Sequence, residues 1–333
     1  MADRFDALPA AQRDVAREAL VGAFGTVPID AIVTMTGGMT TASVYRVEVG
    51  PRKYLLRIEG QPSPLRNPYQ YRSMAIAAEA GIAPEVHYVD EVARVAVMDF
   101  VEKVPLKAFP GGPTALARAL GLLFSRVQAT PVFPFYVNYP EIVARLFAHV
   151  RRTGLFEDGA LDPHFKRLEL VIKAYEAGAT KLVSSHNDPT PGNILFDGKR
   201  LWLIDWESAC RNDPLVDVAI VLDGLLRTPA LEETFLYAWL GRAPDEDVRV
   251  RLEVTRALTR LYYAGVFLSA SAAASWVRGD TDLSVPSVAD FQQAIEAGRS
   301  KAGTPENWHI RGKMFLASFL SGIATPGFDG PAS

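Results

Sequence analysis

Apolar residues first recur at helical spacing and then gather in short runs. Leu8, Ala11, Val15 and Ala19 predict an amphipathic helix near the start of the chain. The runs that follow are rich in β-branched and aromatic residues and are separated by turn-forming residues, a pattern typical of strands. They predict strands over 31–36, 43–49, 53–58, 86–90 and 92–100, with a helix over 67–80 between the third and the fourth. We therefore expect the first hundred residues to form a small sheet.

From residue 113 onward the apolar spacing is mainly helical, with one interruption. A polar loop runs into a short apolar segment, and a second apolar segment follows a turn at Asp197-Gly198. Asp-Gly between apolar runs is typical of a tight hairpin. Such a hairpin returns Asp205 to the neighbourhood of Asp188 and Asn193.

Composition favours a globular protein with a large core, since 49% of its 333 residues are hydrophobic. The formal net charge of −3 indicates neither a nucleic-acid partner nor an acidic tail. The N-terminus lacks a signal-peptide pattern, and the longest uncharged run, over 261–277, falls short of the ~18 apolar residues of a spanning helix. The single Cys210 cannot form an internal disulfide. We expect a cytoplasmic protein without a membrane partner, and the sequence is silent on its oligomeric state.

Three polar residues carry the candidate chemistry. Asp188 and Asn193 are separated by four residues, the spacing of a kinase catalytic loop. Oxygen ligands from Asn193 and Asp205 suit a hard cation such as Mg²⁺. Asp188 would then accept the proton of an attacking hydroxyl.

The motifs around these residues resemble the aminoglycoside phosphotransferase and choline kinase superfamily. They are His186-Asn187-Asp188 with Asn193, followed by Ile204-Asp205-Trp206-Glu207. The resemblance implies an α+β, bilobal, protein-kinase-like fold, with a small antiparallel nucleotide-binding lobe over 1–102 and a larger helical lobe over 103–333. It also implies transfer of the ATP γ-phosphoryl group to a hydroxyl of a small molecule. Gly81-Ile82-Ala83-Pro84 favours a choline- or ethanolamine-like acceptor, with an aminoglycoside or another hydroxylated metabolite as the alternative.

The same resemblance implies ATP and Mg²⁺ as cofactors and assigns residues to the nucleotide. These are Gly37, Gly38, Thr40, Thr41, Arg57, Asp99, Phe100 and Val101. The first four belong to a loop whose amides and hydroxyls can approach phosphates. The arginine lies among large apolar residues and therefore needs a partner or a ligand. The last three form a hinge whose backbone groups would bind adenine.

The chain departs from the family pattern at one position. The helix over 67–80 should carry an acid that pairs with Arg57, but the expected position holds Gln70. Either a weaker glutamine contact or another acid, such as Glu59, would then replace the usual ion pair.

The acceptor site and the support of the loop follow from the same resemblance. Residues expected beside the acceptor are Glu207, Tyr262, Tyr263 and Trp276. An aromatic cage with a nearby acid suits a quaternary ammonium group through cation–π contacts, and ordinary packing is the alternative interpretation of each ring. His186 is expected to order the loop and Asp217 to brace it.

Two other functions remain open at this stage. A nucleotide-binding regulator without catalysis is favoured only by Gln70. A metal-dependent hydrolase would use His186, Asp188 and Asp205, although such a site usually takes further histidine ligands and the chain has only five histidines.

Overall fold

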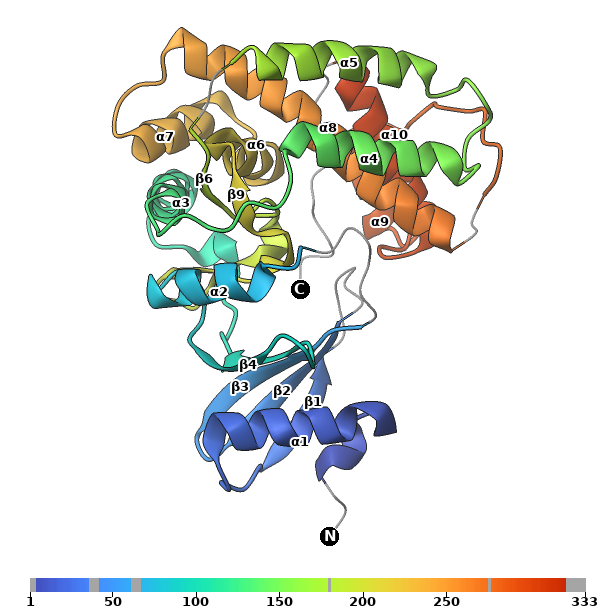
Figure 1. The fold of residues 1–333 in the computed structure, drawn as a ribbon. Coiled ribbons are helices and arrows are strands. Elements are labelled where there is room, and N and C mark those ends of the chain that lie inside the picture. Colours follow the sequence, from blue (N-terminus) through green and yellow to red (C-terminus); the bar gives the residue numbers. More distant parts are fainter. Residues whose placement is uncertain (1–3, 36–41, 61–66, 179–180, 275–276, 322–333) are drawn as a thin grey trace.

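The computed structural model describes residues 4–35, 42–60, 67–178, 181–274 and 277–321. It consists of a small antiparallel sheet joined to a larger helical region (Figure 1). In sheet order the strands are β1 (Ala31–Met35), β2 (Ser43–Val49), β3 (Arg52–Ile58), β5 (Val95–Asp99) and β4 (Val86–Asp90). All neighbouring strands pair antiparallel, which confirms the predicted sheet and the α+β class.

Helix α1 (Ala10–Phe24) follows the short turn η1 (Arg4–Ala7) and covers one face of this sheet (Figure 1). Its buried residues include Ala16 and Ala19, which pack with the fully buried strand residues Val47 and Leu56. Small side chains let a helix approach a sheet closely, so the alanines set the position of α1.

Helix α2 (Gln70–Glu79) lies between the sheet and the helical region (Figure 1). Met74 and Ala77 pack in the core cluster that also contains Leu120 of the helical region. Ser73 Oγ donates a hydrogen bond of 2.9 Å to the carbonyl oxygen of Ala209, far along the chain. Because α2 belongs by sequence to the first part but packs on the second, it couples the two. The division at residue 102 stays a prediction.

The remainder of the chain is mainly helical, as its apolar spacing predicts. Its helices are η2 (Leu106–Ala108), α3 (Gly112–Gln128), α4 (Tyr139–Arg152), α5 (Asp162–Glu176), α6 (Pro214–Leu225), α7 (Pro229–Leu240), α8 (Glu246–Ala273), α9 (Val288–Glu296) and α10 (Pro305–Ser321). Helices α4, α5, α6 and α10 all pack against the long, centrally placed α8. No helix in the described part of the chain has the length and apolar character needed to cross a membrane.

Two short strand pairs frame the segment with the candidate chemistry. Strand β6 (Val183–Ser185) pairs with β9 (Cys210–Asn212), and β7 (Ile194–Phe196) pairs with β8 (Leu201–Leu203). The one-turn helices η3 (Pro191–Asn193) and η4 (Trp206–Ser208) lie between them. The turn joining β7 to β8 uses Gly198 at φ +90°, a conformation that favours glycine. This confirms the predicted hairpin.

A close approach of α3 and α7 provides a test of the packing. A Cβ atom at Gly121 would lie 2.5 Å from the carbonyl oxygen of Phe235 and 2.9 Å from Ala238 Cβ. We expect Gly121→Ala to lower the free energy of unfolding by about 1–3 kcal/mol in urea denaturation followed by circular dichroism. This loss would occur although alanine favours a helix by about 1 kcal/mol over glycine. Arg118→Ala, at an exposed position of α3, is the control, and equal stability of the two variants would contradict this packing.

Candidate active site

A buried carboxylate anchors the loop that leads to Asp188. Asp217 on α6 is fully buried and accepts hydrogen bonds from the backbone N–H groups of His186 (2.9 Å) and Asn187 (2.7 Å). Burial raises the pKa of Asp217 to about 6, and the two backbone bonds oppose that rise. Asp217 therefore satisfies two buried donors at the point where the loop leaves β6.

The side chain of Asn187 fastens the same loop on the other side. Asn187 adopts φ +62°, a left-handed conformation that asparagine tolerates better than most residues. Its Nδ2 donates to the carbonyl oxygen of Ser208 (2.9 Å), and its Oδ1 accepts from Asn212 Nδ2 (2.7 Å) and Ser185 Oγ (3.0 Å). The only signal for this role in the sequence was the place of Asn187 beside the motif aspartate.

His186 is buried, with both ring nitrogens engaged. Its Nε2 lies 2.9 Å from the carbonyl oxygen of Ile204, so the hydrogen must be on Nε2. Its Nδ1 then accepts from the backbone N–H of Asp188 at 3.4 Å. Burial lowers the pKa of His186 to about 4, which keeps the ring neutral. This arrangement links the loop to the end of β8 and leaves neither nitrogen to bind a metal.

Asp188 lies between two hydrogen-bond donors. Tyr263 Oη on α8 donates to its Oδ1 (2.6 Å), and Asn193 Nδ2 donates to its Oδ2 (2.9 Å). Burial raises the pKa of Asp188 to about 8; the bond from Tyr263 lowers the pKa, and the nearby charges of Asp205 and Glu207 raise it. A carboxyl group with this pKa is mostly protonated at neutral pH and becomes available as a base as the pH rises toward 8.

Asn193 and Asp205 lie next to each other. The backbone N–H of Ile204 donates to the carbonyl oxygen of Asn193 at 3.0 Å, which sets the neighbouring Asp205 beside it. Asn193 uses its Nδ2 for Asp188, so its Oδ1 is the atom suited to a cation. Asp205 adopts φ +64° between β8 and η4. One amide oxygen and one carboxylate form a donor set that fits Mg²⁺.

Arg57 reaches this group from the sheet. Its Nη1 lies 2.8 Å from Asp205 Oδ1, and its Nη2 lies 2.8 Å from Glu207 Oε2. Burial disfavours the charge, but Asp205, Glu207 and Glu59 together hold the pKa of Arg57 above its usual value. The guanidinium therefore joins β3 to the segment after β8 by two charge-assisted bonds.

Among the described contacts, Gln70 forms no hydrogen bond to Arg57. It binds instead to Glu59, the acid that directly follows the strand of Arg57. Gln70 is buried at the start of α2, and its Nε2 donates to Glu59 Oε1 at 2.5 Å. Tyr71 Oη donates to the same oxygen at 3.1 Å. The expected glutamine contact to Arg57 is therefore absent among the described contacts, and Gln70 instead binds the alternative acid, Glu59.

The hinge expected to bind adenine follows the end of β5. The backbone N–H of Asp99 donates to Glu85 O (2.8 Å), and that of Phe100 donates to Lys53 O (3.2 Å), so both serve the sheet. Asp99 Oδ1 also lies 2.8 Å from His87 Nε2. Glu85, His87 and Asp99 have ligand atoms within 4.8 Å of one another, but they are partly or fully exposed and carry no further sign of a metal.

Several predicted residues lie outside the described part of the chain. They are Gly37, Gly38, Thr40 and Thr41 of the phosphate loop and Trp276 of the acceptor site.

Three tyrosines pack together near Asp188, one pair of them edge to face and one pair tilted. The rings of Tyr262 and Tyr263 are 5.3 Å apart at 82°, and Tyr262 lies 5.8 Å from Tyr139 on α4. The buried Tyr139 Oη has no hydrogen-bond partner among the described residues. Burial and the charge of Asp188 both act to raise the pKa of Tyr139. Sequence reasoning missed Tyr139 because α4 is remote from the motifs along the chain.

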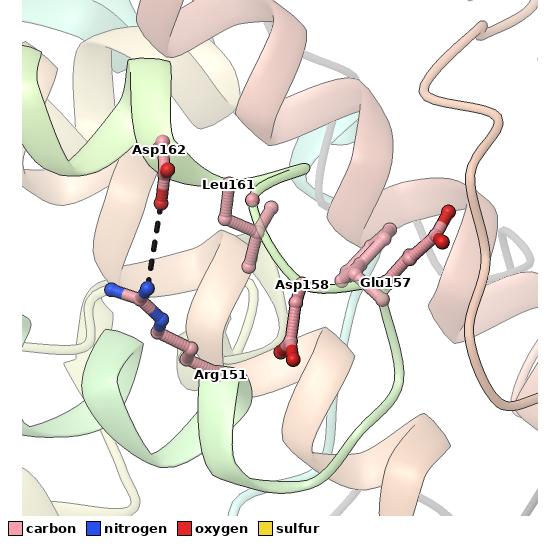
Figure 2. A pocket seen from close by; sticks show the side chains of 7 residues that line it. Arg151, Glu157, Asp158, Leu161 and Asp162 are labelled. Carbon is pink, nitrogen blue, oxygen red and sulfur yellow. Dashed lines mark ion pairs between the residues drawn. The ribbon is translucent and has the colours of Figure 1, made fainter.

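A small surface pocket lies elsewhere, at the connection of α4 and α5. Figure 2 shows Arg151 and Asp162 facing each other there as an ion pair of 3.5 Å, with Glu157 and Asp158 nearby. None of the predicted site residues lines it.

The family follows from comparison with known proteins. The sequence matches the Phosphotransferase enzyme family over residues 34–252, more than half of the chain, and the protein belongs to this family. Protein LicA of Haemophilus influenzae is 24% identical over 197 residues, which are 56% of each chain, so the protein spans about half of the length of this relative.

Solved structures share the fold. A choline/ethanolamine kinase family protein from Mesorhizobium loti superimposes with a TM-score of 0.62 at 24% identity, covering 92% of this chain and 98% of that one. The choline kinase LicA from Streptococcus pneumoniae gives a TM-score of 0.64 at 16% identity, covering 93% and 100%. The expected protein-kinase-like arrangement is thereby confirmed.

The anchoring of the loop can be tested at Asp217. Asp217→Ala would leave two buried N–H groups without an acceptor, and we expect it to lower the free energy of unfolding by about 2–5 kcal/mol. Asp217→Asn keeps one acceptor oxygen and should cost less. Urea denaturation measures both, with the exposed Asp14→Ala on α1 as the control. An alanine variant as stable as the asparagine variant would contradict this role.

Proposed function

We propose that the protein transfers the γ-phosphoryl group of ATP to a hydroxyl of a small molecule, with Mg²⁺ as the metal. The observation that carries this proposal is the meeting of Asp188, Asn193 and Asp205 at one place, which Arg57 reaches from the sheet. A base, two oxygen ligands and a cation for phosphates are the parts that phosphoryl transfer requires.

Each residue has a distinct part in the mechanism. Asp188 accepts the proton of the acceptor hydroxyl while Tyr263 and Asn193 hold its two oxygens in place. Asn193 Oδ1 and the Asp205 carboxylate would hold Mg²⁺, which neutralises phosphate charge when bound. Arg57 turns to the phosphates and supplies the remaining positive charge. Catalysis is then mainly positioning and electrostatics.

Residues of the sheet would bind the nucleotide. A neighbouring fold is that of LicA in complex with AMP, which supports an adenine nucleotide here. We assign the adenine to backbone groups of 99–101 other than the N–H groups of Asp99 and Phe100, which serve the sheet, and the phosphates to Arg57 and to the loop with Gly37 and Gly38. The intact Asp188, Asn193 and Asp205 argue against a silent regulator. The engaged nitrogens of His186 argue against a hydrolase that uses this residue as a ligand.

The acceptor lies beside the tyrosines in this proposal. Tyr262 and Tyr263 offer aromatic faces, and Glu207 offers a charge that would attract a cation. The similar structures from Mesorhizobium loti and Streptococcus pneumoniae are named for choline or ethanolamine, so we favour such an acceptor. A spectinomycin phosphotransferase also shares the fold, with a TM-score of 0.54, and keeps aminoglycosides as the alternative. A cytoplasmic location belongs to the same proposal.

The assignment of the base and the metal ligand is tested by two substitutions. Asp188→Asn and Asp205→Ala should each abolish phosphotransfer, because one loses the base and the other a ligand of the cation. Thermal unfolding should show that both variants remain folded. Release of ADP from Mg-ATP is measured with pools of choline and ethanolamine, aminoglycosides, sugars, and hydroxylated amino acids. Turnover by either variant within a few-fold of the parent would contradict the assignment.

The pH dependence of the reaction depends on Tyr263. Its hydroxyl bonds to Asp188 Oδ1 and lowers the pKa of that carboxyl group, so Tyr263→Phe should raise the pKa. A group with a higher pKa loses its proton at higher pH. The rising limb of kcat/KM against pH should therefore move upward by about one unit.

Tyr262→Phe is the matched control for this substitution, since Tyr262 packs against Tyr263 without bonding to Asp188. The rising limb of kcat/KM against pH should stay at the same pH in Tyr262→Phe. Identical pH profiles for the two variants would show that the hydroxyl of Tyr263 does not tune the base.

A further inference from the structure

We propose that Glu59, held in place by Gln70, is the acid that positions Arg57 against the phosphates of the nucleotide. The family pattern places this acid on the helix over 67–80. Here the acid, Glu59, directly follows strand β3, and the amide of Gln70 on α2 orients it. The inference rests on the proposed function, because Arg57 has phosphates to bind only if the protein binds a nucleotide.

The strand sets the two charged side chains on one face. The backbone N–H of Glu59 donates to Arg94 O at 3.0 Å, which extends the pairing of β3 with the chain before β5 by one residue. Residues two apart in a strand share a face, so Arg57 and Glu59 point to the same side. The intervening Ile58 is buried in the core on the opposite side.

Helix α2 then fixes the carboxylate. Gln70 Nε2 and Tyr71 Oη donate to the same atom, Glu59 Oε1, at 2.5 and 3.1 Å. Both donors are neutral, so they orient the carboxylate without cancelling its charge. The charge acts on its surroundings, because it helps to raise the pKa of both Arg57 and Glu207.

The charges around Arg57 indicate when Glu59 is needed. Three carboxylates, from Glu59, Asp205 and Glu207, all act to raise the pKa of its guanidinium. Arg57 now bonds to Asp205, the expected metal ligand. Once Asp205 faces a cation, the guanidinium must turn toward the phosphates. Glu59 is the acid on the same strand that can hold the guanidinium there.

In this arrangement Gln70 stabilises the acid at position 59, so a second acid at position 70 would be unfavourable. A carboxylate at position 70 would face the carboxylate of Glu59 at the present 2.5 Å contact, and like charges at that distance repel. Restoring the family acid at position 70 alone should therefore harm the site. Exchanging the acid and the amide together should preserve it.

The test compares Glu59→Gln, Gln70→Glu and the double variant Glu59→Gln/Gln70→Glu. The probe is MgADP, titrated by calorimetry without any acceptor. Each single variant should bind MgADP about tenfold more weakly than the parent, and the double variant should return to within about threefold of it. Glu18→Gln on α1 and Gln293→Glu on α9 change the same residue types at exposed positions and should bind like the parent.

The rescue by the double variant separates positioning from a general structural effect, since two damaging changes would otherwise add. Thermal unfolding without nucleotide checks the fold, and Glu59→Asp replaces Glu59→Gln if the latter does not fold. Glu59→Asp should weaken MgADP binding because the shorter acid cannot reach Arg57 and Gln70 together.

Three results would overturn the inference: single variants that bind like the parent, tighter binding by Gln70→Glu, or a double variant as weak as both singles combined. A parent that binds no MgADP would instead contradict the proposed function itself.

Discussion

The site depends on how two backbone N–H groups are satisfied inside the protein. Those of His186 and Asn187 are buried, and a buried donor without an acceptor costs about 1–3 kcal/mol. Asp217 accepts both from α6, a helix that itself packs on α8. With the loop held there, Asn187 can adopt its left-handed conformation and Asp188 can face Asn193.

A second constraint is electrostatic and joins the sheet to the helical region. Arg57 is largely withdrawn from water, and the cost of that burial is offset by the carboxylates of Asp205 and Glu207. Among the described residues, these two carboxylates outnumber the guanidinium of Arg57. In the proposed function their excess negative charge would attract a divalent cation. The same contacts therefore serve both the architecture and the proposed chemistry.

Local patterns were sufficient to predict much of the fold. The strands of the sheet follow from short apolar runs, and the hairpin follows from Asp197-Gly198, because turn type and strand period are properties of neighbouring residues. The spacing of Asp188, Asn193 and Asp205 predicted the candidate site for the same reason, since one short segment carries all three. The contacts of Asn187 and the place of Tyr139 were not predictable, because their partners lie on other elements.

The sequence by itself thus predicted most of the elements, the family and the candidate site residues. Only the tertiary structure decided which charged and polar groups face one another. Gln70 by itself suggests the loss of an ion pair, but α2 brings it to Glu59, eleven residues earlier in the chain and directly after β3. The physical reason is that a side chain's partner across two elements depends on how those elements pack, which no local spacing encodes.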